Sequence, residues 1–385
     1  MNSATKAFLQ RKFGEYYLTA RLELPPQFSK REWAFVLFDP AYPKLVMRRH
    51  KAFSSAKECL TYLSSVIPAH AYYSTACYAY PSATRMQDKK WEGADVIFDL
   101  DADKVVTEFS NSYAHVLKEV KNETAKLVDF LIHDFSVDPK EITIVFSGGR
   151  GYHVHLRESS LAGLGSHERR EIVNYLTGTG LEAEYILMKL NNSEEIANTC
   201  WEIRINRWIS RYFESLRLLE RQTATKELSA VKNIGRRRAQ NILDALAQGS
   251  NIPPLVQSKL LPASAWKGIV REAISDLRVR IDMPVTADTK RLIRLPTSLH
   301  GGSGLLVTPL TFADFDHFEP LRDAVVFSED LVPIKVLKPA ITEIKGETIK
   351  VDHSTKRLPE HTAIYLMARG LAEYESGRSK NHQKR

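Results

Sequence analysis

Two hydrophobic periodicities divide the chain. Short runs of aromatic and β-branched residues predict strands at 33–38, 96–100 and 142–146, the last two of them buried. Between the last two runs, apolar residues recur with helical spacing over 113–133. This strand–helix–strand order predicts an α/β core, because a helix in that position covers one face of a sheet.

The middle of the chain has a different character. It is rich in Arg, Glu, Leu and Ala, and its apolar residues have helical spacing. We interpret residues 166–270 as a mostly helical domain inserted into the α/β core, which then consists of residues 1–165 and 271–385. Strand-like alternation returns at 277–282 and predicts a further strand there.

The strand predicted at 96–100 is accompanied by acidic residues of one parity, Asp95, Asp99, Asp101 and Asp103. Residues i and i+2 of a strand point to the same side, about 6.6 Å apart. Asp99 and Asp101 therefore offer oxygen ligands of the kind that Mg²⁺ and Mn²⁺ prefer. Parity alone does not single out this pair, and a strand ending in an acidic turn has the same pattern.

A second pattern, SGGRGYHVHL at 147–156, joins a strand to a glycine turn. Glycines let the backbone approach a ligand closely, and exposed N–H groups in such turns favour phosphate. Arg150 would fork onto phosphate oxygens, and Ser147 and His153 would add hydrogen bonds. The spacing is not that of a P-loop, and an ordinary β-hairpin with a solvated arginine is the alternative.

The alternation at 277–282 places Asp282 on the polar face, beside Arg280. Asp282 would then complete a carboxylate triad, or it would be neutralised by Arg280 on an exposed strand. The loop at 289–304 interleaves cations with apolar residues and ends in a glycine turn, which makes Arg294 and His300 candidates for binding a triphosphate.

Composition narrows the choice of partner. The 385 residues carry 54 Lys and Arg against 46 Asp and Glu, and a net charge of +8 is typical of proteins with an anionic partner, most often nucleic acid. Surface solubility alone explains such a charge equally well. The three cysteines are far apart, predict neither a disulfide framework nor a zinc ribbon, and fit a cytoplasmic protein. Neither a signal peptide nor a membrane-spanning run is predicted, so we expect no membrane partner.

In their order and spacing, three segments together resemble the small catalytic subunit of archaeal and eukaryotic DNA primases. They are FDLDAD at 98–103, SGGRGYHVHL at 147–156 and RIDMPVTADTKRLIRLPTSLHGGSGL at 280–305. Weaker similarity is found in REWAF at 31–35, MRRHKAF at 47–53 and LPEHTAIYLMARGLAEYE at 358–375. Each motif is unspecific by itself, but the ordered set is highly specific and covers nearly the whole chain.

The resemblance implies a mixed-sheet primase core that synthesises primers on single-stranded DNA during replication, by metal-dependent nucleotidyl transfer. It implies that Asp99, Asp101 and Asp282 are catalytic carboxylates that bind Mg²⁺ or Mn²⁺. The incoming nucleoside triphosphate would be bound by the remaining candidates: Ser147, Arg150, His153, Arg294, His300 and, more weakly, Arg49. A large primase subunit and the template strand are the implied partners.

The chain departs from the family in one respect. Family members often carry a Cys/His zinc knuckle between the first two motifs, but residues 102–146 contain no cysteine, so we expect no structural zinc. A second feature, at 231–243, resembles one helix-hairpin-helix turn, which would grip DNA phosphates or would simply cap a solvated helix.

Two alternative functions remain at this point. One is a repair or plasmid-type primase-polymerase of the same superfamily. The other is a non-catalytic nucleic-acid-binding module, although such a module has no need to gather carboxylates beside phosphates, where like charges repel.

Overall fold

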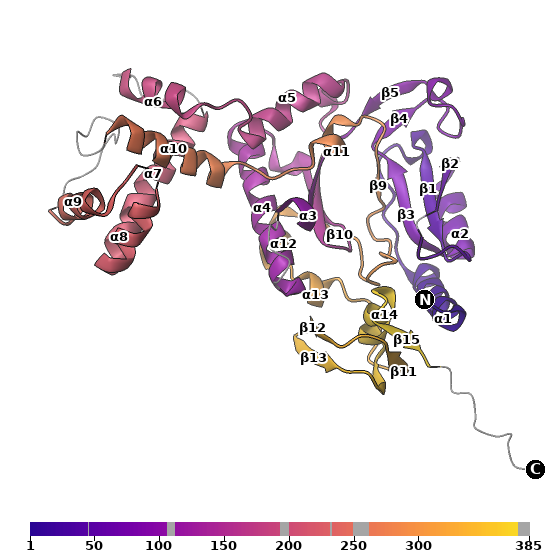
Figure 1. The fold of residues 1–385 in the computed structure, drawn as a ribbon. Helices are drawn as coiled ribbons and strands as arrows, with labels where there is room; N and C mark the ends of the chain where they lie inside the picture. Colours follow the sequence, from indigo (N-terminus) through magenta and orange to yellow (C-terminus); the bar gives the residue numbers. More distant parts are fainter. Residues whose placement is uncertain (45, 106–111, 193–199, 232, 249–261, 376–385) are drawn as a thin grey trace, which may run out of the picture. The chain divides into compact units, whose positions relative to one another are not determined.

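The computed structural model describes residues 1–375 apart from 45, 106–111, 193–199, 232 and 249–261 (Figure 1). The chain divides into two compact units, the first made of Met1–Val173 with Arg280–Arg385 and the second of Asn174–Val279. The second unit overlaps the insertion expected at 166–270. That it folds as a separate inserted domain stays a prediction.

Two four-stranded sheets form the centre of the first unit. The strands of one are β1 (Trp33–Leu37), β2 (Met47–Lys51), β3 (Pro68–Ser74) and β9 (Leu292–Arg294). Those of the other are β6 (Val96–Asp101), β7 (Ile142–Phe146), β8 (Gly151–Leu156) and β10 (Thr308–Leu310). Their orders are β2-β1-β3-β9 and β10-β7-β8-β6. The predicted strands at 33–38, 96–100 and 142–146 are therefore confirmed.

The combination of helices and sheets confirms the α/β class, but the sheets differ from the mixed sheet expected. Every strand pairing in the described part of the chain is antiparallel. The reason is the position of β8. Strands β6 and β7 both pair antiparallel with β8, so they run in the same direction but are separated by it.

Helices cover these sheets because their apolar residues repeat at helical spacing. The first unit contains α1 (Ser3–Thr19), α2 (Ala56–Val66), α3 (Ala102–Val105), α4 (Tyr113–His133), α11 (Met283–Ala287), α12 (Phe312–His317), α13 (Pro320–Asp323) and α14 (Glu360–Ala368). Helix α4 begins where the Ser112 hydroxyl accepts from His115 N–H, and it packs on β6 and β8. No helix among the described residues is long and apolar enough to cross a membrane.

One hydrophobic cluster links the two sheets. It includes Trp33 and Phe35 of β1, Leu63 of α2, and Ile97 of β6, all buried. Ile97 follows directly on the first residue of β6, so the cluster ties the strand that carries Asp99 to the neighbouring sheet. The carboxylates thus stand on a strand that is held from both sides.

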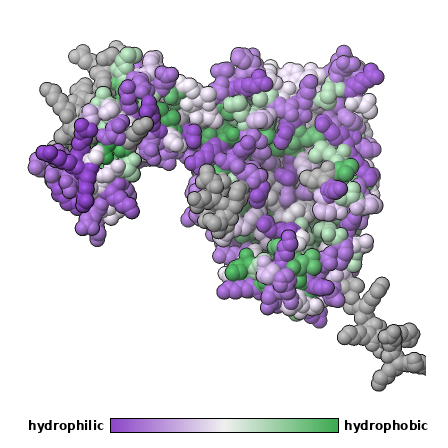
Figure 2. Space-filling model, in the orientation of Figure 1, coloured by the Kyte–Doolittle hydropathy of each residue, from purple (hydrophilic) through white to green (hydrophobic). Residues whose placement is uncertain are grey.

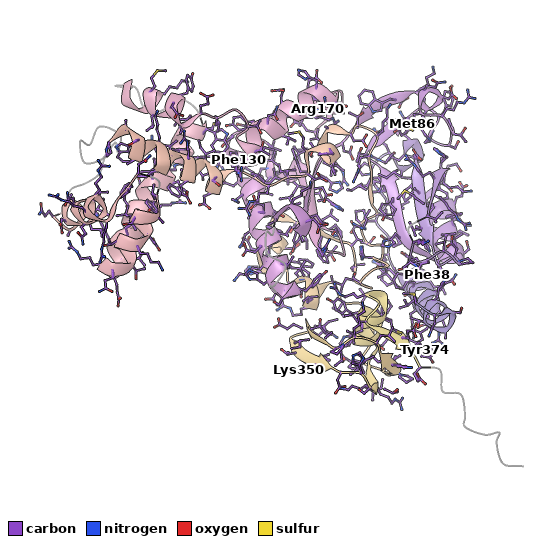
Figure 3. The ribbon with its side chains drawn as sticks, in the orientation of Figure 1. Phe38, Met86, Phe130, Arg170, Lys350 and Tyr374 are labelled. Atoms are coloured by element: carbon purple, nitrogen blue, oxygen red, sulfur yellow. The ribbon has the colours of Figure 1, made fainter. Side chains whose placement is uncertain are left out.

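The C-terminal part adds small sheets and a buried helix. Its strands are β11 (Leu331–Val336), β12 (Ala340–Ile344), β13 (Glu347–Val351), β14 (Thr355–Pro359) and β15 (Ala372–Tyr374). Strand β4 (Ala76–Tyr78) pairs with β5 (Trp91–Ala94) elsewhere in the unit. Helix α1 connects the C-terminal part to the sheet that contains β1. Phe8 stacks on Tyr374 of β15, and Phe13 packs edge-on against Phe38, which follows β1 directly (Tyr374 and Phe38 are labelled in Figure 3). Hydrophilic side chains cover most of the face of this unit seen in Figure 2.

The prediction of a strand at 277–282 is wrong. Helix α10 (Ala263–Leu277) continues to the start of that segment, and residues 278–282 pair with no strand. The alternation that suggested a strand is still present in the burial, because Val279 and Ile281 are buried while Arg280 is exposed. The segment makes individual backbone hydrogen bonds to other elements in place of the regular bonds between two strands. Alternating burial here therefore indicates an extended segment without a partner strand.

The second unit is helical. It contains the end of α5 (Ser166–Thr177), whose larger part belongs to the first unit, with α6 (Ala183–Asn192), α7 (Cys200–Leu218), α8 (Arg221–Ala230), α9 (Arg236–Ala247) and α10. Helix α10 packs on α6 and α7, and α9 packs on α8. In the segment 231–243, Asn233 has a φ of 71° and Gly235 is the N-cap of α9. DNA contact at this hairpin stays a prediction.

The close pairing of β6 with β8 makes Gly151 intolerant of any side chain. A Cβ added there would collide with Leu100 O and lie 3.1 Å from Asp101 Cα. We expect Gly151→Ala to lower the free energy of unfolding by about 1–3 kcal/mol, the usual cost of overpacking, measured by urea denaturation. Gly163→Ala is the matched control, since an added Cβ meets nothing within 4 Å there. Equal stability of the two variants would contradict this account of the β6–β8 pairing.

Candidate active site

The first two carboxylates stand near the end of β6, on the same side of the strand. In the pairing with β8, Asp99 lies opposite His153 and Asp101 lies opposite Gly151. His153 Nε2 lies 3.6 Å from Asp99 Oδ1. Burial, with Arg294 and Arg291 nearby, lowers the pKa of His153 to about 3, so this histidine is neutral at physiological pH.

Asp282 reaches the same place by a single backbone contact. Its N–H donates to Asp99 O at 3.1 Å, immediately before α11 begins. Its carboxylate lies 3.6 Å from Lys104 Nζ. Arg280, the alternative partner suggested by the sequence, instead donates from Nη1 to Val105 O at 2.8 Å.

The three carboxylates influence one another electrostatically. Burial, together with the nearby Asp101 and Asp282, raises the pKa of Asp99 to about 6, and Arg294 and Arg291 oppose the shift. A cluster of hard oxygen donors with this mutual repulsion fits Mg²⁺ or Mn²⁺, because a divalent cation offsets the repulsion. Among the described residues, no group of three or more His, Cys, Asp or Glu side chains is placed to hold a metal ion, so metal binding by Asp99, Asp101 and Asp282 stays a prediction, as does the absence of structural zinc.

The remaining acidic residues of the same parity have other roles. Asp95 precedes β6, and its carboxylate lies 3.0 Å from the buried Arg31. Asp103 lies in α3, where its carboxylate lies 2.9 Å from Arg150 Nη2. The regular strand assumed from parity ends at Asp101, so the four acidic side chains do not form one row.

The glycine turn between β7 and β8 positions the predicted phosphate ligands. Ser147 is buried, and its Oγ accepts from Gly149 N–H at 3.3 Å. Gly148 has a φ of 72°, which a residue with a Cβ rarely adopts. The Tyr113 hydroxyl donates to Gly149 O, so α4 fixes the turn from outside.

A second turn, at 300–304, packs against the first. His300 Nδ1 lies 3.1 Å from Ser303 Oγ, and that hydroxyl donates to Gly148 O. A Cβ added to Gly148 would lie 2.6 Å from His300 Cβ, so the two turns fit only with glycine at this position. Burial first, and then nearby arginines, hold the pKa of His300 well below its usual range, and it acts as a neutral hydrogen-bonding group.

Arg49 is held by Glu32, a residue that was not among the candidates predicted from the sequence. Glu32 is fully buried, and its carboxylate receives Arg49 Nε at 3.0 Å and Arg49 Nη2 at 3.3 Å. The equally buried Lys89 lies 3.5 Å from the same carboxylate. This two-point pairing fixes the direction of the Arg49 guanidinium.

Two cavities meet at these residues. The carboxylate cavity, about 470 Å³, is lined by Arg49, Asp99, Asp101, His153 and Arg294, together with Lys290 and Arg291. The glycine-turn cavity, about 480 Å³, is lined by Asp101, Ser147, Arg150, Arg294 and His300, together with Tyr113, Ser303 and Arg369. Both are lined by Asp101 and Arg294. Eight of the nine predicted site residues therefore lie along these cavities, and Asp282 lines neither.

Comparison with known proteins identifies the family of the chain. Residues 98–312 match the family described as DNA primase small subunit. The chain belongs to the DNA primase small subunit family. Over 97% of its length it is 41% identical to the DNA primase small subunit PriS of Methanococcoides burtonii, and it covers 100% of that relative. Two further PriS proteins are each 40% identical to the chain over 97% of its length. The match covers 100% of the protein from Methanothrix thermoacetophila and 98% of the protein from Methanosarcina barkeri.

The primase family and its role in DNA replication are thus confirmed, and the chain is a DNA primase enzyme. Sequence reasoning did not single out several further residues that line these cavities, among them Lys290, Arg291, Tyr113 and Arg369. Lys290 and Arg291 lie within the basic loop already singled out and were recognisable as cations. Tyr113 and Arg369 had no local signal, because each reaches the site from a helix that reads as ordinary core.

The raised pKa of Asp99 predicts a stability change with pH. An acid with a raised folded-state pKa destabilises the fold when ionised, so the cost is absent below the ordinary pKa of 3.8 and complete above about 6. A shift of about two units corresponds to about 3 kcal/mol at most. In chelator at pH 8, Asp99→Asn should melt at a higher temperature than the wild type, and this advantage should shrink between pH 6 and pH 4. A wild type that is the more stable of the two at pH 8 would refute the raised pKa.

Proposed function

We propose that this primase joins nucleoside triphosphates into primers on single-stranded DNA, with the reaction at the junction of the two cavities. The observation that carries the proposal is the position of Asp99 and Asp101 in a cleft whose other charged lining residues, apart from Asp288, are lysine and arginine. Cations alone suffice to bind a polyphosphate, and carboxylates among them weaken that binding. Their presence favours a catalytic cleft over a binding module.

In the proposed reaction, a 3′-hydroxyl attacks the α-phosphate of a bound nucleoside triphosphate. The new O–P bond forms while the bond to the leaving pyrophosphate breaks, and the proton of the hydroxyl passes to solvent water. Mg²⁺ or Mn²⁺ held by Asp99, Asp101 and Asp282 would supply Lewis-acid stabilisation of the attacking and leaving oxygens. The protein's own contribution is then mainly orientation and charge neutralisation.

The glycine-turn cavity is the proposed site of the triphosphate. Arg150 would provide charge-assisted hydrogen bonds, after exchanging its contact with Asp103 for phosphate oxygens. Ser147 and the neutral His300 would add uncharged hydrogen bonds. Arg294 lines both cavities and would reach phosphate from either side. Arg49 and the neutral His153 face the carboxylate cavity, where they would orient the reacting end of the nucleotide.

The proposed partners follow from the family and the charge. The relatives are named small subunits, so we propose that a larger primase subunit completes the enzyme. The net charge of +8 suits a single-stranded DNA template, whose phosphates would be attracted to basic residues.

Nucleotide incorporation on single-stranded DNA, with Mg²⁺ or Mn²⁺, tests this function. We expect new strands from the wild type, and an at least about hundredfold lower rate from Asp101→Asn, because one ligand oxygen and its charge are lost at the reacting phosphate. Asp88→Asn is the matched control, since Asp88 is exposed and lines neither cavity.

Equal rates in the wild type and Asp101→Asn would remove the carboxylate assignment. If neither chain is active alone, the assay is repeated with a candidate large subunit. Continued absence of metal-dependent synthesis together with salt-dependent DNA binding would support the binding module instead.

A further inference from the structure

Arg369 is a cation at the site that lies outside the segment matched to the family. It follows α14 directly, and its backbone N–H donates to carbonyls of that helix as the C-cap. Residues 361–367 of α14 are all buried, so the helix is a rigid support. The side chain of Arg369 emerges from this support into solvent, at the helix end where the dipole favours a positive charge.

Helix α14 packs directly on the 300–304 turn. Gly304 has a φ of 74°, and a Cβ there would lie 2.6 Å from Ile364 Cγ2. The end of α14 is therefore held at a fixed place relative to His300. Any movement of the turn would therefore also displace α14, the helix that Arg369 follows.

Two aromatic rings orient the guanidinium. Its central carbon lies 4.6 Å from the centre of the Tyr113 ring and 5.3 Å from that of Tyr365. The hydroxyl of Tyr113 donates to Gly149 O, so the same tyrosine contacts both Arg369 and the glycine turn. Stacking on rings restrains the planar group while leaving its N–H edge available for hydrogen bonds.

The charge of Arg369 is not neutralised by the protein. Among the described residues, no carboxylate forms an ion pair with it, whereas Arg150 in the same cavity lies 2.9 Å from Asp103 and 3.7 Å from Asp101. An oriented, unpaired guanidinium in a cavity lined by Ser147 and His300 is suited to a multiply charged anion.

We propose that Arg369 binds the pyrophosphate portion of the incoming nucleoside triphosphate. The assignment rests on the proposed function, since it takes the glycine turn as the triphosphate site. The α-phosphate must react at the carboxylates, and Asp101 is shared by both cavities. The remaining phosphates then extend into the glycine-turn cavity, which Arg369 lines. Through Arg369, the C-terminal part of the chain would then favour binding of triphosphates over monophosphates.

Equilibrium binding of ATP, AMP and inorganic tripolyphosphate, by calorimetry with Mg²⁺ and no template, tests the proposal. Arg369→Gln should weaken binding of ATP and of tripolyphosphate about 10- to 100-fold, the effect of losing a charged hydrogen-bond donor, and leave AMP unchanged. Arg369→Lys keeps the charge and should recover most of the affinity. Arg357→Gln removes another exposed arginine, on β14, and should change nothing.

An unchanged ATP affinity in Arg369→Gln would overturn the proposal, and so would an equal loss for ATP and AMP, which would indicate a general structural effect. Loss of affinity for single-stranded DNA with ATP binding intact would assign Arg369 to the template backbone instead. A primer-synthesis assay tests the proposed function independently of the role of Arg369. A wild type that is active and an Asp101→Asn that is inactive would uphold the primase site even where Arg369 proves dispensable.

Discussion

Strands β6 and β8 pair antiparallel so that Asp99 faces His153 and Asp101 faces Gly151, and the site is assembled around that register. A shift by one residue would turn both carboxylates to the opposite side of the sheet. The same pairing holds the glycine turn beside the carboxylates, because β8 begins at Gly151. Asp282 then joins by donating its N–H to Asp99 O, so its position depends on β6 as well.

The electrostatic balance of the site follows from this arrangement. Carboxylates are brought close enough that burial and mutual repulsion raise the pKa of Asp99, while the cations of β9 and the preceding loop oppose that shift. His153 and His300 are kept neutral by burial, so they bind without adding charge. A cluster of acids beside restrained guanidiniums suits a reaction in which a cation and a polyphosphate arrive together.

Much of this was predictable from the sequence because the relevant patterns are local. The helix at 113–133 and the strand at 142–146 have the predicted limits, since their periodicity is long or strongly apolar. The segment 277–282 shows the limit of such reasoning, because alternation fixes which side chains are buried but does not supply a neighbouring strand. Glu32 and Arg369 were missed because their partners, Arg49 and Tyr113, are distant in sequence. The antiparallel pairing of the strands was likewise not predictable, because it depends on the position of β8 between β6 and β7.

Direct titration of Mn²⁺, followed by electron paramagnetic resonance, tests the central claim that Asp99, Asp101 and Asp282 form one cation site. The wild type and the Asp88→Asn control should bind Mn²⁺ alike. Asp282→Asn should bind it at least about tenfold more weakly, because one carboxylate ligand is lost. Unaltered Mn²⁺ affinity in Asp282→Asn, with the protein folded, would contradict the claim that the contact between Asp282 and β6 builds a shared metal site.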